Sequence, residues 1–285
     1  MRVKKLVTDL LPDKLFLSLY YRKVFGRPIN WKHPVTFNEK LQYLKLFDRR
    51  PEYRKYVDKY EVKEFFREKI GGAYIVPTYG VWDRFDDIPF DRLPNQFVLK
   101  CTHDSGGIVI CKDKKSFDRA AAKEKLEHSL KVDFYKWTRE WPYKGIKRRI
   151  LAEAYLEDKT YGELRDYKFF CFNGEPKVMF IASGRNTDDP RFDFYDMDFN
   201  HLSLTKHYPN ADTPPERPIN FDKMKKFARI LSCGIPHVRV DFFEADGNLY
   251  AGEMTFYSQG GFGKFDDPAW DKKMGDYLCL PKQKH

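Results

Sequence analysis

Cysteine is scarce in this sequence, and its spacing suits neither a disulfide framework nor a zinc site. The chain has five cysteines among 285 residues, and no two of them form a Cys-x-x-Cys pair. Disulfide frameworks use even, regularly spaced sets, and structural zinc sites use closely paired ligands. We therefore expect free thiols and a reducing compartment, which favours the cytoplasm.

Long apolar runs are missing from the first part of the chain. Charged residues interrupt the segment from Met1 to Tyr21 throughout, so we expect neither a secretory signal nor a membrane-spanning helix there. The segment Lys4–Phe25 mixes apolar with basic residues and could lie on an anionic membrane. We favour the alternative, a helix docked on the protein surface.

Positive charge and aromatic side chains are abundant. The formal net charge is +10, aromatic residues make up 17% of the chain and hydrophobic residues 42%. This length and composition suit one compact enzyme of two or three lobes. A basic surface favours an anionic partner such as a nucleotide, an acidic polymer, a nucleic acid or a membrane, but a merely solubilising surface explains the charge equally well.

Helical segments and antiparallel strand pairs alternate along the chain. Thr36 and Glu39 have the spacing of a capping box, which begins a helix. Asn173-Gly174 and Asp246-Gly247 predict hairpin turns between apolar runs. The pattern predicts an α+β fold with antiparallel sheets and interspersed helices. The expected helices cover residues 52–69, 117–131 and 222–232, and the expected strands cover 96–100, 108–111, 150–156, 166–172, 177–182, 238–243 and 249–255.

A lysine at the end of a strand is followed by a glycine-containing loop. Lys100 ends the apolar run Phe97–Leu99, and Gly106 and Gly107 come soon after it. Adjacent glycines allow the backbone to approach an anion closely, so the lysine and the loop could bind phosphate. The GxxxxGK[ST] phosphate-binding motif is absent, and an ordinary hairpin explains the pattern as well.

Two carboxylates occupy the two arms of one predicted hairpin. Arg239 and Asp241 are two residues apart on the first arm, and Glu253 and Thr255 are two apart on the second. Residues spaced by two share one face of a strand, so all four could point into one site. Carboxylates with a hydroxyl suit Mg²⁺, with substrate phosphates completing its shell. An exposed charged cluster is the alternative.

Asp166 and Lys168 show the same spacing on another predicted strand. An acid there could hold ribose hydroxyls while the lysine meets phosphates. A simple surface pair explains these two residues equally well.

Taken in order, these motifs resemble the ATP-grasp superfamily. The opening motif of that superfamily resembles Asp58-Lys59, Lys63 and Ile75-Val76-Pro77, and its second lysine and glycine loop resemble Phe97–Gly107 (FVLKCTHDSGG). Its adenine-binding hinge strand resembles Ile150–Leu156. Its metal signature resembles Arg239–Asp241 with Glu253–Thr255. Thr255 stands where that signature has asparagine, and a hydroxyl is the poorer metal ligand.

The resemblance implies ATP and Mg²⁺ as cofactors, held between two lobes, and it assigns roles by position. The implied catalytic residues are Lys100, Lys168 and Arg239; the nucleotide-binding residues are Lys59, Lys100, Ser105, Gly106, Gly107, Glu153, Ala154, Tyr155, Asp166 and Lys168; the metal ligands are Asp241, Glu253 and Thr255. Backbone N–H groups of Gly260 and Gly261 could bind an oxyanion.

Longer phrases resemble the TupA-like ATP-grasp proteins in particular. They include Pro34–Lys40 (PVTFNEK), Ile75–Trp82 (IVPTYGVW) and Asp166–Gly174 (DYKFFCFNG). That group is associated with bacterial cell-surface polysaccharides, including the peptide part of teichuronopeptide. The resemblance implies an ADP-forming carboxylate–amine ligase that attaches an amino acid to uronate carboxylates through an acyl phosphate. A glycosyltransferase, a carbohydrate kinase and an RNA- or membrane-binding module stay open as alternatives.

The same resemblance predicts a division of the chain and a set of partners. Residues 1–50 would form an N-terminal helical segment, 51–95 a substrate lobe, 96–156 the small ATP-grasp lobe and 157–285 the catalytic lobe. The expected partners are an amino acid and an anionic glycan that could be lipid-linked, with no nucleic acid. We expect a cytoplasmic protein that could associate peripherally with the inner membrane face. Lys144, Lys147, Arg148 and Arg149 would attract the glycan, and Trp137 and Trp141 could stack on sugars.

Overall fold

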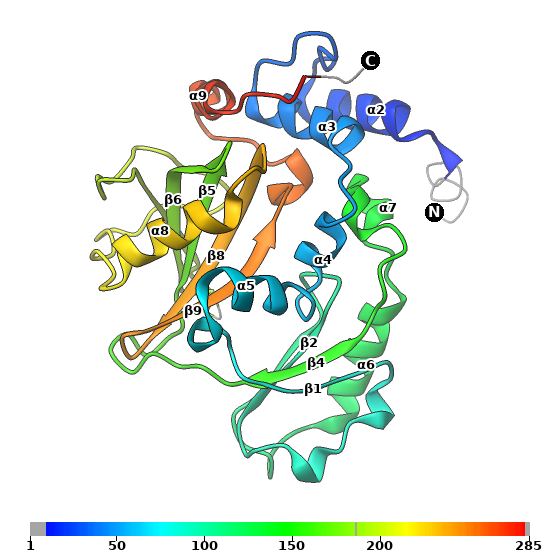
Figure 1. Ribbon diagram of the computed structural model, residues 1–285, viewed down its shortest axis with the longest axis vertical. Coiled ribbons are helices and arrows are strands. Elements are labelled where there is room, and N and C mark those ends of the chain that lie inside the picture. The colour runs from blue at the N-terminus through cyan, green and yellow to red at the C-terminus, as the bar shows by residue number, and fades with distance from the viewer. Residues whose placement is uncertain (1–9, 186, 283–285) are drawn as a thin grey trace.

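The computed structural model describes residues 10–185 and 187–282, and two antiparallel sheets form its frame (Figure 1). The four-stranded sheet has the order β1 (Thr78–Trp82), β4 (Ile150–Ala154), β2 (Phe97–Cys101) and β3 (Ile108–Cys111). Helix α6 (Arg119–Lys131) packs against β2 and β3, and its Leu126 is buried with Phe97 and Leu99 in a separate small core. This sheet carries Lys100 and Glu153 towards the rest of the molecule.

The five-stranded sheet has the order β7 (Arg191–Tyr195), β6 (Glu175–Ser183), β5 (Asp166–Phe172), β8 (His237–Ala245) and β9 (Asn248–Thr255). Helix α8 (Phe221–Ser232) covers one face, where Phe169 packs on Phe221 and Cys171 lies against Ala228. Side chains alternate along a strand, so Asp166, Lys168 and Phe170 occupy the opposite face. Residues on both faces of β5 are buried, which explains its nearly continuous apolar sequence.

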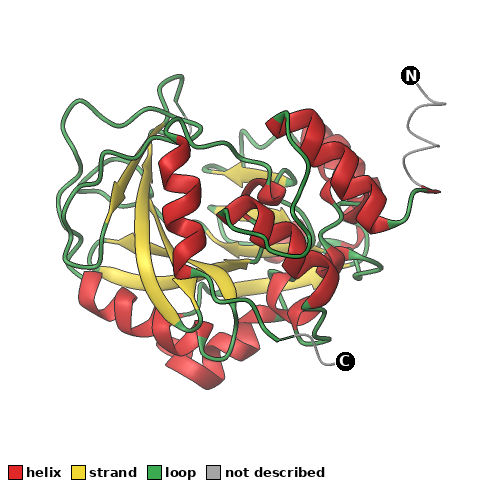
Figure 2. Cartoon of the chain, turned by 90° about the horizontal axis from the view of Figure 1, so that it is seen from above, coloured by secondary structure: helices red, strands yellow, loops and turns green. Residues whose placement is uncertain are grey.

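Three helices gather beyond one end of this sheet: α2 (Asp13–Phe25), α3 (Phe37–Phe47) and α9 (Pro268–Tyr277) (Figure 1). The predicted capping box is confirmed at the start of α3, because Thr36 accepts the Glu39 N–H and Glu39 accepts the Thr36 N–H. Phe37 then packs on Phe172 and Phe265. Figure 2 shows the strands in the interior and helices around them.

Short helices make the remaining connections. They are α4 (Tyr53–Val57), α5 (Val62–Ile70), α7 (Tyr135–Thr138) and the 3₁₀ turns Gly72–Tyr74, Phe85–Asp87, Phe90–Arg92, Trp141–Tyr143 and Ser258–Gly261. The single helix predicted over residues 52–69 is wrong, because Asp58 interrupts it. The Asp58 carboxylate accepts the N–H groups of Tyr60 and Glu61, an alternative to helical hydrogen bonding.

The sequence analysis missed the strands β1 and β7, the helices α7 and α9, and the 3₁₀ turns. Strand β1 pairs with β4, so a lobe boundary between residues 95 and 96 would divide one sheet. The strand predicted over 150–156 ends at Ala154. The two predicted hairpins form at their expected turns, as β5–β6 and β8–β9.

The N-terminal helix docks on the protein by its described part. Residues 1–9 of the basic segment lie outside the described residues, but Phe16, Leu17 and Tyr21 of α2 are buried together with Ile29 and Phe262. Within residues 10–185 and 187–282, no helix is both long and apolar enough to span a membrane. All five cysteines are described and free of disulfides, as their spacing predicts.

Candidate active site

A row of side chains crosses the face of the five-stranded sheet that helix α8 does not cover. The strand register aligns Phe194, Phe180, Lys168, Asp241 and Glu253 from β7 to β9. The next row places Phe170 beside Arg239, and Arg239 opposite Thr255. One half of this face is therefore charged and the other half is aromatic.

Asp241 is the most enclosed acid in the row, with a side chain 1% exposed. Lys168 donates to one of its oxygens at 2.6 Å, and Arg239 donates to both at 2.7 and 2.6 Å. Burial raises the pKa of Asp241, and these two cations act against that rise. The charges of Asp241 and Glu253 in turn outweigh burial and raise the pKa of Arg239.

Glu253 faces Asp241 but is held more loosely. Its carboxylate oxygens lie 3.5 Å from Arg239 and 3.9 Å from Lys59, and its side chain is 36% exposed. Burial acts to raise the pKa of Glu253, but the charges of Lys59, Lys168 and Arg239 prevail and lower it to about 2. Glu253 is therefore an ionised and accessible carboxylate. The Thr255 hydroxyl accepts a hydrogen bond from Arg239 at 3.1 Å.

A β-bulge lies beside the two carboxylates. Asp241 pairs with Glu253 while Phe242 pairs with Ala251, which leaves Gly252 as the extra residue. A Cβ at Gly252 would come within 2.8 Å of the Phe243 ring, so a side chain does not fit there. Bulges bend a strand and redirect its side chains, and this one lies next to Glu253.

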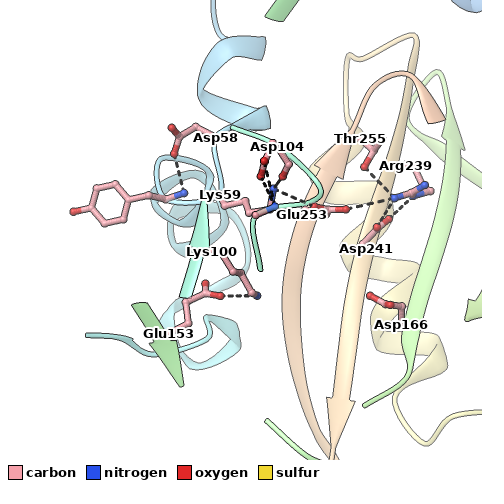
Figure 3. Close-up of polar contacts among 12 residues, drawn as sticks. Asp58, Lys59, Lys100, Asp104, Glu153, Asp166, Arg239, Asp241, Glu253 and Thr255 are labelled. Atoms are coloured by element: carbon pink, nitrogen blue, oxygen red, sulfur yellow. Dashed lines mark hydrogen bonds and ion pairs between the residues drawn. The ribbon is translucent and has the colours of Figure 1, made fainter. Parts of the chain in front are cut away.

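Lys59 and the glycine loop form the opposite wall of the site (Figure 3). The Lys59 ammonium donates to the Asp104 carbonyl, and its backbone N–H donates to the Thr102 carbonyl at 3.0 Å. The Gly107 N–H donates to the Asp104 carboxylate at 3.2 Å, and a Cβ on Gly107 would meet Ser129 at 2.5 Å. Gly107 thus serves close packing, and phosphate binding by Ser105 and Gly106 stays a prediction.

Lys100 shares a carboxylate with a second lysine. Glu153 is 6% exposed by its side chain and lies 2.7 Å from Lys100 and 2.6 Å from Lys63. Burial would raise the pKa of Glu153, but the two lysines lower it. Burial would lower the pKa of Lys100, but Glu153 raises it. The resemblance assigned Glu153 to the adenine; the structure places its side chain between these lysines, as their positioning group.

Asp166 pairs with two cations at the edge of the row. Lys168 donates to it at 3.2 Å, and Arg185 donates to its other oxygen. Burial opposes ionisation, but Lys168 and Arg185 lower the pKa of Asp166. Arg185 was missed in the sequence, because it lies in a loop without periodicity. Its contact with Asp166 adds a cation to the site.

Two backbone groups suggested for ligand binding are already occupied. The Ala154 N–H donates to the Pro77 carbonyl at 2.9 Å, and the Gly260 N–H donates to the Tyr257 carbonyl at 2.7 Å. The Gly260 N–H therefore already has a partner, and oxyanion binding by Gly260 and Gly261 stays a prediction. Tyr155 remains the predicted backbone contact for adenine; its hydroxyl donates to Glu157.

The predicted glycan-attracting residues are largely engaged with acids. Arg149 pairs with Asp58 and Glu61 at 3.1 and 2.9 Å, and Lys147 lies 2.9 Å from Asp83. Trp141 is buried in the main core, whereas Trp137 is 55% exposed and lines a cavity. Of the two tryptophans, only Trp137 is placed to stack on a ligand.

Asp241 and Glu253 are the carboxylates that the charged row offers to Mg²⁺. Within the described part of the chain, no three His, Cys, Asp or Glu side chains form a metal-binding group. Asp241 and Glu253 are opposite one another, and Mg²⁺ is commonly held by one or two carboxylates plus substrate phosphates. The two carboxylates fit such an ion in kind, although Lys168 and Arg239 occupy both Asp241 oxygens in this structure. Thr255 is engaged by Arg239 and adds little to the set.

A cavity of about 480 Å³ lies over the two rows. Its lining includes the charged residues Lys59, Lys168, Arg239 and Glu253, and it also includes side chains that the sequence analysis missed: Phe170, Phe180, Phe192, Phe194 and Lys206. Phe180 contacts Phe192 and Phe194 with ring centroids 4.6 and 5.0 Å apart. Cavities of this volume suit small ligands.

Several solved structures are similar to the chain at low sequence identity. D-alanine–D-alanine ligase from Bacillus anthracis, solved with ATP, is 15% identical with a TM-score of 0.40, over 71% of this chain and 54% of that one. The same ligase from Helicobacter pylori is 13% identical with a TM-score of 0.45, over 85% and 69%. A RimK domain ATP-grasp protein from Sphaerobacter thermophilus is 12% identical with a TM-score of 0.42, over 81% and 70%. The chain therefore spans about half the length of the Bacillus anthracis ligase.

The sequence itself gives the decisive comparison. No curated protein matches the chain. The family model for TupA-like ATP-grasp proteins matches residues 39–279, which include both sheets and every residue of the charged row. The chain belongs to the TupA-like ATP-grasp family.

Proposed function

We propose that this protein is an ATP-dependent ligase that joins a carboxylate to an amine and releases ADP and phosphate. The observation that carries the proposal is the cross-strand row, in which Lys168, Asp241 and Glu253 continue into Phe180 and Phe194. Groups suited to a polyphosphate and a surface suited to an organic acceptor thereby share one cavity. Membership of the TupA-like ATP-grasp family supports the same reading.

The residues around the cavity have distinct tasks in this reaction. Lys59, Lys100 and Lys168 neutralise the phosphate chain, and Asp241 and Glu253 hold Mg²⁺. When bound, the ion supplies further neutralisation of phosphate charge. Arg239 lies between Asp241 and Ser258, where it can stabilise negative charge that develops on a transferring phosphoryl group.

The reaction has two bond-forming steps. A substrate carboxylate oxygen attacks the γ-phosphorus of ATP, the bond between that phosphorus and the β–γ bridging oxygen breaks, and ADP leaves. The resulting acyl phosphate is attacked at its carbonyl carbon by an amine. The amine loses a proton, the carbon–oxygen bond to phosphate breaks, and an amide and inorganic phosphate are formed.

For the substrates, we propose a uronate of a bacterial surface polysaccharide as the carboxylate and an amino acid as the amine. The aromatic wall and the exposed Trp137 suit the apolar faces of sugar rings. The net charge of +10 suits an anionic glycan, including one on a lipid carrier at the cytoplasmic membrane face. The family resemblance supplies the link to such polysaccharides.

The test is to incubate the protein with ATP, Mg²⁺, a uronate oligosaccharide and amino acids, and to trap any acyl phosphate with hydroxylamine. The expected results are ADP release that depends on the uronate and a hydroxamate on the glycan. Phosphate that remains on a sugar hydroxyl would instead identify a kinase. Turnover of a sugar nucleotide without ADP release would identify a glycosyltransferase.

A further inference from the structure

The lining of the cavity includes a buried cation that the proposed reaction does not use. Lys206, in the loop after β7, lines this cavity and is 4% exposed. Its ammonium lies over the Phe265 ring, 3.9 Å from the centroid, and no hydrogen-bond acceptor contacts it among the residues the structure describes. A lysine that is both buried and without an acceptor is costly in an unliganded protein.

The nearest acid does not compensate for this charge. Asp271 in α9 is the carboxylate that acts on Lys206 through space, but one Asp271 oxygen accepts the backbone and side-chain N–H groups of Asn38, each at 2.9 Å. Asp271 therefore anchors α9 to the start of α3. It forms no ion pair with Lys206 in the described structure.

Two further neighbours of Lys206 do not offset its charge: Arg239 is positively charged and His237 is neutral. Arg239 repels Lys206 through space, and His237 is buried and neutral because burial lowers its pKa to about 3. Burial, with Arg239 adding to it, lowers the pKa of Lys206 to about 7 despite the attraction of Asp271. An anion placed between Arg239 and Lys206 would relieve this repulsion, and the cavity is open to both residues.

We propose that Lys206 binds a substrate carboxylate that does not react, separate from the carboxylate that is phosphorylated near Arg239. Phe180 and Phe192 line the same cavity and offer an apolar surface to the body of that substrate. The shared chemistry is a compound with two carboxylates. Its source is either two successive uronates of a glycan or a dicarboxylic amino acid, and the inference rests on the ligase function proposed above.

Two matched probe pairs distinguish these sources. Digalacturonate against galacturonate tests the glycan, and L-glutamate against L-glutamine tests the amino acid. Binding is measured by calorimetry with Mg²⁺ and a non-hydrolysable ATP analogue present. The wild type should bind the dicarboxylate of one pair about 10- to 100-fold more tightly, the usual strength of a charge-assisted hydrogen bond.

Lys206→Met should abolish that preference, because it keeps the side-chain volume and removes the charge, whereas Lys206→Arg should retain it. Lys264→Met, a change of the same charge at a nearby exposed position, should bind as the wild type does. At pH 6, unliganded Lys206→Met should also melt about 2 °C or more above the wild type, since a buried unpaired cation is lost. A lysine with a structural role would give the opposite shift.

Equal binding within both probe pairs by the wild type, or a preference that survives in Lys206→Met, would overturn the inference. A lower melting temperature of unliganded Lys206→Met would overturn it as well. The ATP analogue separates this failure from failure of the proposed function. If the analogue does not bind the wild type, the ligase proposal itself is lost; if it binds and only the carboxylate preference is missing, the ligase proposal stands.

Discussion

The ammonium group of Lys59 lies 3.9 Å from a carboxylate oxygen of Glu253, and this contact joins the turn after α4 to strand β9 (Figure 3). Lys59 also donates to the Asp104 carbonyl in the glycine loop. One side chain thus connects three segments that are distant in sequence and adds positive charge where a phosphate chain would lie. It is the first position at which nucleotide binding can be tested.

Lys59→Met should weaken ATP binding about 10- to 100-fold, because a charge-assisted contact to phosphate is removed. The measurement is a titration of ATP with Mg²⁺ followed by thermal shift or calorimetry. Lys55→Met provides the matched control at an exposed position in α4. Unchanged affinity in Lys59→Met would remove this residue from the nucleotide site.

Asp241 and Glu253 should respond differently to loss of charge. Asp241→Asn leaves buried Lys168 and Arg239 without their shared partner, so we expect about 3–5 kcal/mol of destabilisation as well as inactivity. Glu253→Gln removes a more exposed acid, so the protein should stay within about 1 kcal/mol of the wild type while turnover falls at least about 100-fold. Urea unfolding and ATP turnover measure the two effects. Normal turnover in Glu253→Gln would make this carboxylate structural.

Glu153 should be energetically coupled to Lys63. Glu153→Gln removes the negative charge between buried Lys63 and partly buried Lys100 and should cost about 3–5 kcal/mol of the free energy of unfolding. Adding Lys63→Met to Glu153→Gln should recover part of that loss, since one uncompensated cation is then removed. A double-mutant cycle by urea unfolding checks this, and strict additivity of the two changes would show that they do not interact.

His237 should make the fold sensitive to acid. Its ring lies between Phe37 and Phe172, and Nδ1 lies 2.8 Å from the Cys171 carbonyl oxygen. Burial lowers the pKa of His237 to about 3, so the unfolded chain binds its proton first as pH falls below about 6.5. This group is fully neutral in both states above that pH, and its contribution to stability is lost progressively between about 6.5 and 3, by at most about 1.4 kcal/mol per pH unit.

Replacing His237 with phenylalanine should therefore flatten the pH dependence of the melting temperature between about 6.5 and 3. The variant also loses the contact with Cys171, so a lower melting temperature at neutral pH is expected alongside the flatter profile. His33→Phe, at an exposed position, is the control. An acid profile in His237→Phe as steep as that of the wild type would assign the effect to other groups.

Much of the charged half of the site follows from local sequence pattern. The turns Asn173-Gly174 and Asp246-Gly247 set two hairpins, and spacing by two places Arg239 with Asp241 on one face. The register of β8 with β9 then brings Glu253 opposite Asp241. The turns and the spacing within each strand are short-range features that the sequence can predict, whereas the alignment of Glu253 with Asp241 depends on the bulge at Gly252, because an unbroken register would place Gly252 opposite Asp241.

The rest depends on contacts between distant segments. The pairing of Glu153 with Lys63, the break at Asp58 and the position of Lys206 leave no periodic signal in the chain. Phenylalanines 180, 192 and 194 have the alternation of ordinary core residues, and only the register of β6 with β7 reveals that they line a cavity. Tertiary packing decides such roles.

The division of one sheet face into a charged half and an aromatic half separates two kinds of change. Substitutions at Phe180 on β6 or Phe194 on β7 alter the acceptor's surroundings, while Asp241 and Glu253 remain two strands away from them or more. Because function resides in sites carried by a common fold, such a layout allows acceptor preference to diverge among relatives without rebuilding the phosphoryl-transfer machinery. A library restricted to the inward positions of β6 and β7 would accordingly test whether the proposed acceptor preference resides in these two strands.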